Sequence, residues 1–364
     1  MTSQSVTACR LPARLVLRSF PMMKQQSGLQ RRLRRPGRDA DVPGRKTTRI
    51  LVTGSEGQIG SELTVELRKR YGDASVVASD LKEPRSDGGP FERLDVTDRA
   101  AFAAICRRHR IDTIVHMAAI LSAKGEHEPL RAWSVNVTGL VNALELARDL
   151  DLARVLCPSS IAVFGPDSPK ENTPQETVLR PTTMYGVTKV TGELLCDYYV
   201  RRFGVDARGL RYPGIVSAET LPGGGTTDYA VEIYYKAVED GRYTCFLAPD
   251  TRLPMMYMPD CIRGTIELLE ADFGRLRHHG DFNLAAMSFT PAELAASIRK
   301  IVPGFEIDYE PDERQTIAES WPSSIDDAAA REEWGWRPEY DLDAMSRDMI
   351  ERLRQRHTAG RLYR

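Results

Sequence analysis

The sequence has few cysteines, and none of them is arranged to bind a metal or to form a disulfide framework. Six are scattered along 364 residues, without a CxxC pair or a histidine at ligand spacing: Cys9, Cys106, Cys157, Cys196, Cys245 and Cys261. This distribution is typical of reduced thiols inside a cell, so we expect an intracellular protein without a metal. The chain also lacks any run near the roughly 18 apolar residues that a membrane-spanning helix needs, so we expect no membrane partner.

Acidic residues are missing from the first 38 positions, although the whole chain is nearly neutral. This segment carries eight arginines and Lys24, whereas the remainder has 41 basic and 51 acidic residues. Arg10, Arg14 and Arg18 recur every four residues among leucines, an amphipathic pattern typical of mitochondrial presequences. A disordered extension is the other interpretation, so we expect a mitochondrial location if the arm is a presequence and a cytoplasmic one otherwise. Nucleic-acid binding would rest on this basic arm alone, and we expect no nucleic-acid partner.

Apolar runs alternate with segments of helical periodicity once a Pro/Gly-containing linker at residues 29–48 has ended. The predicted strands are Arg49–Thr53, Ser75–Asp80, Phe91–Val96, Thr113–Ala119, Arg154–Ser160 and Ala207–Tyr212. The predicted helices between them are Gly57–Tyr71, Asp98–His109, Leu130–Leu150 and Tyr185–Phe203. Such alternation, with right-handed crossovers, predicts an α/β protein with a doubly wound parallel sheet of the Rossmann type.

The alternation breaks after Pro213, which predicts a smaller C-terminal substrate lobe. We expect a basic extension at 1–46, a dinucleotide-binding domain at 47–213, a lobe at 214–258 and 286–345, and a tail at 346–364. Within this layout Tyr229–Ala237 is predicted to be helical and Thr251–Met258 extended. Two segments between 259 and 285, Cys261–Leu269 and Asp281–Ala285, are predicted to return to the sheet.

The string GSEGQIG, Gly54–Gly60, follows the first predicted strand and opens a helix. Gly54 permits a tight turn, Gly57 lets the backbone approach a pyrophosphate, and Gly60 allows close helix–strand packing; Gln58 and Ile59 complete the loop. The phosphates would lie at the positive end of the helix. Asp80 closes the second strand, where its carboxylate can bind ribose hydroxyls and repel a 2′-phosphate, so NAD is favoured over NADP.

Two further pairs of residues lie at predicted strand ends, where ligands bind in open α/β sheets. Asp95 and Val96 end the third strand and are expected beside the adenine, and Ala118 and Ala119 end the fourth and are small enough to let the cofactor pass. Lys82 and Arg85 lie close enough to Asp80 to leave NADP open as an alternative.

Tyr185 and Lys189 lie one helical turn apart on one face of a predicted helix. A neighbouring ammonium favours the phenolate, which can take a proton from an alcohol as a hydride leaves its carbon. Ser160 ends the preceding strand and can hold the substrate oxygen by a hydrogen bond. These three residues are the predicted catalytic group.

The order of these motifs resembles that of the extended short-chain dehydrogenases/reductases. TGxxGxxG, the strand-end Asp, the Asn of VNVTG (Asn136), the Ser and YxxxK all occur, and the resemblance covers residues 49–340. It implies a mainly structural role for Asn136 near the cofactor. Within the family two rivals stay open: a nucleotide-sugar epimerase or dehydratase, and a regulator that binds NAD without catalysis, although such regulators usually lose the Tyr or Lys.

Finer strings resemble the short-chain L-threonine 3-dehydrogenases. They are PSSIAVFGP (158–166), RPTTMYGVTK (180–189), LRYPGIVSA (210–218), PGGGTTDYA (222–230), TRLPMMYMPDC (251–261), AMSFTPAELA (286–295) and AESWP (318–322). The resemblance implies metal-independent oxidation of L-threonine to 2-amino-3-oxobutanoate with NAD, Tyr185 acting as base, Lys189 and Ser160 assisting it, and Ile215 packing beside the nicotinamide.

A zwitterionic substrate needs hydrogen-bond donors for its carboxylate. We expect backbone N–H groups around Gly225, with the hydroxyls of Thr226 and Thr227, to supply them. Ser122 is a further expected contact, Trp321 is expected to wall the methyl group, and the triglycine 223–225 suggests a lid. The wide apolar faces of Leu130–Leu150 and Tyr185–Phe203 predict a homodimer, as the family resemblance also implies.

Overall fold

The computed structural model describes residues 46–84, 88–220, 225–360 and 362. The predicted basic arm, Arg85 and most of the triglycine lie outside these residues. The described chain belongs to one compact unit, which begins at Gly44. None of its helices has the length and apolar character needed to cross a membrane.

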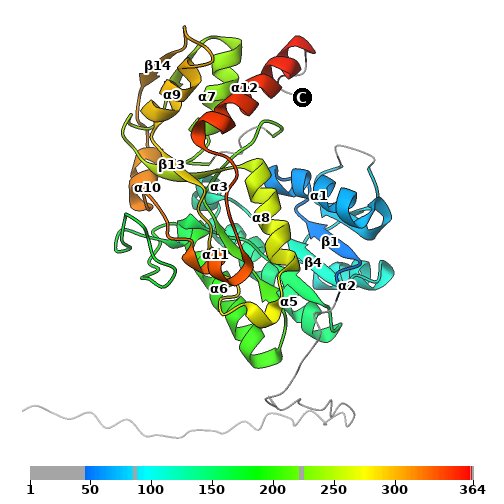
Figure 1. The fold of residues 1–364 in the computed structure, drawn as a ribbon. Helices are drawn as coiled ribbons and strands as arrows, with labels where there is room; N and C mark the ends of the chain where they lie inside the picture. The colour runs from blue at the N-terminus through cyan, green and yellow to red at the C-terminus, as the bar shows by residue number, and fades with distance from the viewer. Residues whose placement is uncertain (1–45, 85–87, 221–224, 361, 363–364) are drawn as a thin grey trace, which may run out of the picture. The chain divides into compact units, whose positions relative to one another are not determined.

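A six-stranded parallel sheet forms the centre of the dinucleotide-binding part (Figure 1). Its strands, in the spatial order β3-β2-β1-β4-β5-β7, are β1 Ile50–Thr53, β2 Val76–Asp80, β3 Phe91–Arg93, β4 Thr113–His116, β5 Arg154–Leu156 and β7 Ala207–Arg208. The order reverses between β1 and β4, which creates the crevice where such folds bind their ligands. The predicted doubly wound fold is confirmed.

Helices cover both faces of this sheet. They are α1 Gln58–Tyr71, α2 Arg99–Arg108, α5 Gly139–Asp149, α6 Met184–Phe203 and α8 Met258–Glu270. Successive side chains of a strand point to opposite faces, and those of β1 are apolar on both: Ile50 and Val52 pack with α1 and α8, whereas Leu51 packs with α2, α5 and α6. Short elements complete this part: α3 Ser122–His127, α4 Pro129–Trp133, a π-helical turn η2 Ser134–Thr138, and the 3₁₀ turns η1 Asp73–Ser75, η3 Ile161–Val163 and η4 Phe273–Arg275.

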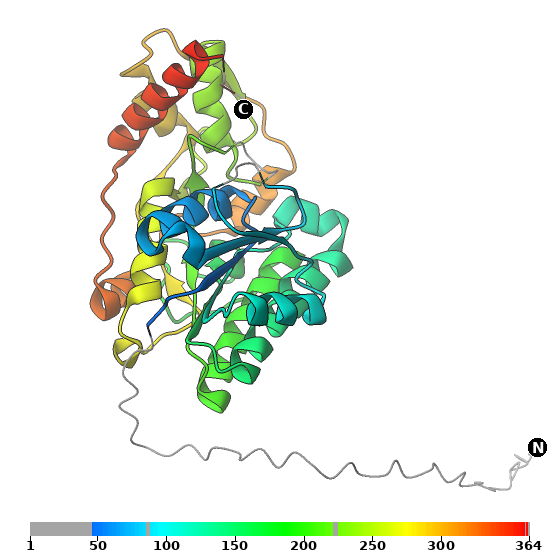
Figure 2. The same ribbon diagram turned by 90° about the vertical axis from the view of Figure 1, so that its right-hand side faces the viewer.

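Three smaller sheets build the rest of the molecule. They comprise β12-β8-β6 (Phe282–Asn283, Leu210–Tyr212, Ser159–Ser160), β13-β11-β9 (Met287–Phe289, Leu253–Tyr257, Gly214–Val216) and β10-β14 (Arg242–Cys245, Glu306–Tyr309). The remaining helices are α7 Tyr229–Glu239, α9 Pro291–Arg299, α10 Arg314–Ser320, α11 Ala328–Trp334 and α12 Leu342–Thr358. Figure 2 shows α12 and α7 side by side at the far end of this lobe, away from β1.

Two predicted strands each divide between the main sheet and a small one. The run 154–160 forms β5 and β6, and the run 207–212 forms β7 and β8, with a break at Gly209. A Cβ on Gly209 would overlap the carbonyl oxygen of Cys157, so this position requires a residue without a side chain. Because the two segments approach so closely here, both leave the main sheet together, and Ser160 lies beyond the edge of that sheet.

The structure differs from the sequence prediction in two C-terminal segments. Cys261–Leu269, predicted to return to the sheet, lies in helix α8, whereas Asp281–Ala285 contributes β12, which pairs with β8 in a small sheet. Residues 346–358, predicted as part of a tail, belong to α12, whose Met345, Met349 and Leu353 are fully buried against the lobe. The lobe therefore extends further along the chain than expected.

Candidate active site

The glycine-rich turn has the geometry that its sequence predicts. Gly54 has φ 68°, in the left-handed region, and a Cβ there would lie 2.6 Å from the backbone nitrogen of Ala118. A Cβ on Gly60 would overlap the carbonyl oxygen of Gly54, and one on Gly57 would lie 3.2 Å from the same atom. The turn can therefore close onto α1 and β4 only with glycines at Gly54 and Gly60, which leaves the N-terminus of α1 open to an anion.

Asp80 lies at the end of β2, and its side chain contacts the glycine-rich turn. Its carboxylate accepts hydrogen bonds from the backbone nitrogens of Glu56 and Lys82, both at 3.0 Å. The side chain is half-buried, so the predicted contact with a ribose remains compatible with its place. Ser55, which the sequence analysis did not single out, has a buried hydroxyl without a hydrogen-bond partner in the described part of the chain. An unpartnered hydroxyl in the turn fits a bound dinucleotide.

Most of the other predicted cofactor residues come just after the ends of strands in the main sheet. Val96 is buried, whereas Asp95 is exposed and accepts hydrogen bonds from Thr97, so the adenine contact predicted for Asp95 stays a prediction. The half-buried Ala118 and Ala119 follow β4 beside the turn. Gln58 and Ile59 begin α1, and the Gln58 amide lies 3.5 Å from the carbonyl oxygen of Ile215 in β9.

Asn136 makes hydrogen bonds that join two parts of the chain. Its side-chain oxygen accepts from the backbone nitrogen of Ile120 at 2.8 Å, and its amide donates to the carbonyl of Ile120 and to the hydroxyl of Thr188, both at 3.0 Å. It lies in the π-helical turn η2, a distortion frequent at functional sites. Asn136 therefore ties the loop after β4 to helix α6, which carries the predicted catalytic pair.

Close packing brings Tyr185 and Ser160 onto adjoining segments. Ser160 ends β6 and caps the turn η3, where its hydroxyl oxygen accepts from the nitrogen of Ala162 at 3.2 Å. A Cβ on Gly186 would overlap the carbonyl oxygen of Ala162, so the first turn of α6 lies directly on η3. Because the Ser160 oxygen accepts that bond, its hydrogen remains available to a substrate oxygen.

Lys189 lies one turn further along α6. Its ammonium donates to the carbonyl of Pro158 at 2.7 Å and stands 5.5 Å from the centre of the Tyr185 ring. The structure therefore brings all three predicted catalytic residues to one edge of β6 and the start of α6. Proton transfer from an alcohol is the chemistry that such a tyrosine–lysine pair can support.

A small cavity of about 30 Å³ lies behind Lys189, between α6 and the end of β4. His116 lines it and is buried: its Nδ1 lies 2.9 Å from the hydroxyl of Thr53, and its Nε2 has no partner in the described residues. Burial, together with the nearby Lys189 ammonium, lowers the pKa of His116 to about 3. The histidine beside Lys189 is therefore neutral at physiological pH.

The predicted substrate residues come from three separate segments. Ser122 is buried in α3, three residues before Gly125, which faces Tyr185. The methyl group of Thr227 packs against Gly214 of β9, next to Ile215. The hydroxyl of Thr226 is fully buried and, among the described residues, has no partner.

The structure bears on two further expectations. The backbone N–H of Gly225 itself donates to the Asp228 carboxylate at 2.6 Å, and the carboxylate contact expected from the N–H groups around it stays a prediction. Trp321 is buried in the hydrophobic cluster on which Tyr185 packs. Its predicted contact with a substrate methyl group remains a prediction.

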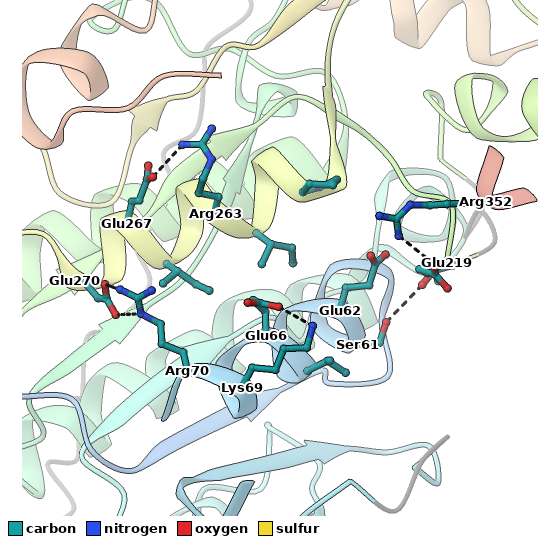
Figure 3. Close-up of a pocket in the computed structure, with 15 residues that line it drawn as sticks. Ser61, Glu62, Glu66, Lys69, Arg70, Glu219, Arg263, Glu267, Glu270 and Arg352 are labelled. Carbon is teal, nitrogen blue, oxygen red and sulfur yellow. Dashed lines mark hydrogen bonds and ion pairs between the residues drawn. The ribbon is translucent and has the colours of Figure 1, made fainter. Parts of the chain in front are cut away.

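A groove of about 890 Å³ lies between α1 and α8 (Figure 3). Valine, proline and isoleucine side chains form its apolar part, and paired charges line it, among them Glu66–Lys69, Glu267–Arg263 and Glu270–Arg70. It shares no lining residue with the catalytic group. No cluster of three metal-ligating side chains occurs within the described ranges.

Comparison with known proteins identifies the family. The model of the NAD dependent epimerase/dehydratase family matches residues 50–285. An uncharacterised epimerase/dehydratase of Staphylococcus haemolyticus is 52% identical over 313 residues, 85% of this chain and 98% of that protein.

Two solved structures are similar over nearly their whole length. An L-threonine dehydrogenase from Clostridium difficile is 51% identical, with a TM-score of 0.84 over 86% of this chain and 99% of that one. Another from Phytophthora infestans is 53% identical, with a TM-score of 0.83 over 85% and 100%. The predicted resemblance to short-chain L-threonine 3-dehydrogenases is confirmed.

Proposed function

The chain belongs to the NAD dependent epimerase/dehydratase family, and from this premise we propose that it oxidises the 3-hydroxyl of L-threonine to 2-amino-3-oxobutanoate. The coarser statement, that the protein is an oxidoreductase with a nicotinamide cofactor, follows from its relatives. The observation that carries the substrate is the 51% identity to an L-threonine dehydrogenase across 99% of that enzyme. An epimerase bound to UDP-glucose from Thermotoga maritima is only 22% identical and shares the fold.

The chemistry follows from the positions of three side chains. NAD, when bound, supplies the hydride acceptor. The Tyr185 phenolate takes the proton of the substrate hydroxyl, and the Lys189 ammonium 5.5 Å from its ring stabilises the negative charge. The Ser160 hydroxyl donates a hydrogen bond to the substrate oxygen and orients it. No step in this scheme calls for a metal.

Substrate recognition is assigned to the segment after β9. The hydroxyl of Thr226, which has no partner among the described residues, supplies a hydrogen bond to the carboxylate, assisted by Thr227 and, from α3, by Ser122. A buried hydroxyl without a partner costs stability, and a polar substrate group would remove that cost. The choice of NAD over NADP rests on Asp80, whose carboxylate would repel a 2′-phosphate.

A homodimer is proposed on the exposed apolar side chains of α4 and α6. Leu130, Trp133, Leu194 and Tyr198 are 82%, 41%, 66% and 52% exposed, and the two helices contact each other. A relative at 50% identity is described as monomeric. Sedimentation at micromolar concentration decides: Leu194→Asp should dissociate a dimer, while Val65→Asp, at an exposed valine of α1, should not.

The deciding experiment measures NADH at 340 nm with L-threonine and NAD in the presence of a chelator. Steady formation supports the proposal. Absence of turnover, with NAD still bound to the purified protein, would contradict it and favour nucleotide-sugar chemistry on the same fold.

A further inference from the structure

A buried carboxylate on helix α6 has no part in the chemistry described so far. Glu193 follows Lys189 by four residues and Tyr185 by eight, so the three share one face of the helix. Its side chain is 6% exposed. Charged side chains are rarely buried unless their partners satisfy them fully, so the partners of Glu193 indicate its role.

Two partners satisfy this carboxylate. Its Oε1 accepts from the hydroxyl of Ser159 at 2.5 Å and from Arg211 Nε at 2.9 Å, and its Oε2 accepts from Arg211 Nη2 at 2.9 Å. Ser159 is the residue directly before the predicted catalytic Ser160. Helix α6 thus contacts two consecutive residues ahead of Ser160: Lys189 binds the carbonyl of Pro158, and Glu193 binds the side chain of Ser159.

Arg211 fixes the carboxylate from the opposite side. In the small sheet β12-β8-β6, Ser159 and Ser160 pair with Arg211 and Tyr212. Arg211 also donates to the carbonyl of Gln175 and to the side chain of Asn283, both at 3.0 Å, and Asp281 lies 3.8 Å from it. These groups hold the guanidinium of Arg211 in place, and the guanidinium in turn fixes the orientation of the Glu193 carboxylate. Ser159, which donates to that carboxylate, is thereby held in register with α6.

We infer that Glu193 is a positioning residue for the proposed reaction, acting through Ser159 to set the place of Ser160 relative to Tyr185. The inference rests on the proposed function, because it assigns the Ser160 hydroxyl to the substrate oxygen. The β6 strand is only two residues long, so its two sheet pairings with β8 leave much of its alignment to the contacts from α6. A hydroxyl misplaced by a fraction of an ångström loses its bond to the reacting oxygen in the transition state.

The test removes the hydrogen bond between Ser159 and Glu193 and leaves the ion pair between Glu193 and Arg211 intact. In Ser159→Ala, Glu193 keeps both bonds to Arg211, so no buried charge is left without a partner. We expect kcat for L-threonine to fall roughly 10- to 100-fold, the scale of a misplaced catalytic group, while the Kd for NAD stays unchanged. Ser159→Thr keeps the hydroxyl and should restore most of kcat.

A matched control separates positioning from stability. Ser297 is a buried serine of the lobe that donates to the Asp343 carboxylate at 2.7 Å, so Ser297→Ala loses a comparable bond away from the site. It should lower the melting temperature as much as Ser159→Ala and leave kcat unchanged. Wild-type kcat in Ser159→Ala, an equal loss in Ser297→Ala, or a parallel loss of NAD binding would each overturn the inference.

Failure of the proposed function would be recognised separately, because the wild type would then not oxidise L-threonine. In that event amide hydrogen exchange in the NAD complex decides the positioning claim. Ser159→Ala should accelerate exchange in a peptide spanning 157–164, and Ser297→Ala should not. Unchanged exchange in that peptide would refute the role of Glu193.

Discussion

The cofactor-binding part and the substrate lobe differ in how clearly the sequence marks their predicted functional residues. In the first part, β1 pairs with β2 and β4, and most predicted cofactor residues lie at or just after the ends of strands that the sequence identifies. The predicted substrate residues lie on α3 (Ser122), in the turn before α7 (Thr226 and Thr227) and directly after α10 (Trp321), at no comparable strand end. Strand ends therefore indicate the first site, whereas the second depends on which separate segments meet after folding.

Two predicted binding residues, one in each part, also differ in how their polar groups are satisfied. In the cofactor turn, the Asp80 carboxylate already has two backbone donors, so the turn is held in place before a ligand arrives. In the lobe, the hydroxyl of Thr226 is buried without a partner in the described structure. A turn that is already hydrogen-bonded and a buried hydroxyl without a described partner should respond differently to substitution, and the following variants test this difference.

The largest effect is expected at the junction of the two parts, in Tyr185→Phe. Without the hydroxyl no proton acceptor remains, so turnover should fall by at least ~100-fold, the usual contribution of acid–base catalysis. NAD binding, measured by fluorescence titration, should stay at the wild-type value. Tyr198→Phe, at an exposed position of the same helix, is the control and should keep its activity. Near-normal turnover of Tyr185→Phe would remove the tyrosine from its role.

A smaller effect is expected within the cofactor part, in Asp80→Ala. Loss of a charge-assisted hydrogen bond, worth about 1.5–3 kcal/mol, should weaken NAD binding by roughly 10- to 100-fold. NADP should lose less, because the carboxylate no longer repels its 2′-phosphate. Asp80→Asn separates the charge from the backbone contacts, and Asp73→Ala, an exposed acid after α1, is the control. An unchanged ratio of the two affinities would exclude Asp80 from cofactor selection.

The sequence predicted the elements of the cofactor part closely, and the reasons lie in particular segments. Helix Gly57–Tyr71 was expected where α1 spans Gln58–Tyr71, and Tyr185–Phe203 where α6 spans Met184–Phe203, because both show helical periodicity after clear start signals. The motif order also pointed to the three predicted catalytic side chains, which lie on adjoining segments.

Other features could not be predicted, for physical reasons. Segment Cys261–Leu269 is buried nearly throughout in α8, and a short apolar run does not distinguish a buried helix from a strand. The few apolar residues of α12 are spaced for one helix face among many charges, so its sequence resembles a polar tail. Glu193, Arg211 and Ser159 meet only after folding, and no local pattern marks their contact.

In the lobe, Thr226→Val should separate recognition from stability. Valine has the shape of threonine, and removing a buried hydroxyl without a partner is nearly neutral or stabilising. The melting temperature should hold or rise, while the KM for L-threonine increases roughly 10-fold, the effect of one lost hydrogen bond. Thr265→Val is the counterpart, because that hydroxyl donates to the carbonyl of Cys261 and contacts Tyr212. It should lower the melting temperature and leave KM unchanged.

The last effect concerns stability in acid rather than activity, and it is expected from His116 in the cofactor part. Its pKa is about 3 in the folded protein against an ordinary 6.5, so between these values the unfolded chain binds more protons than the native one. Stability is therefore lost as pH falls through this window, by at most about 1.4 kcal/mol per pH unit. His116→Asn cannot take up the proton, so its free energy of unfolding, measured by urea titration from pH 7 to 4, should fall less steeply. His357→Asn, at an exposed histidine of α12, should follow the wild type, and parallel curves for all three proteins would show that His116 does not carry the acid sensitivity.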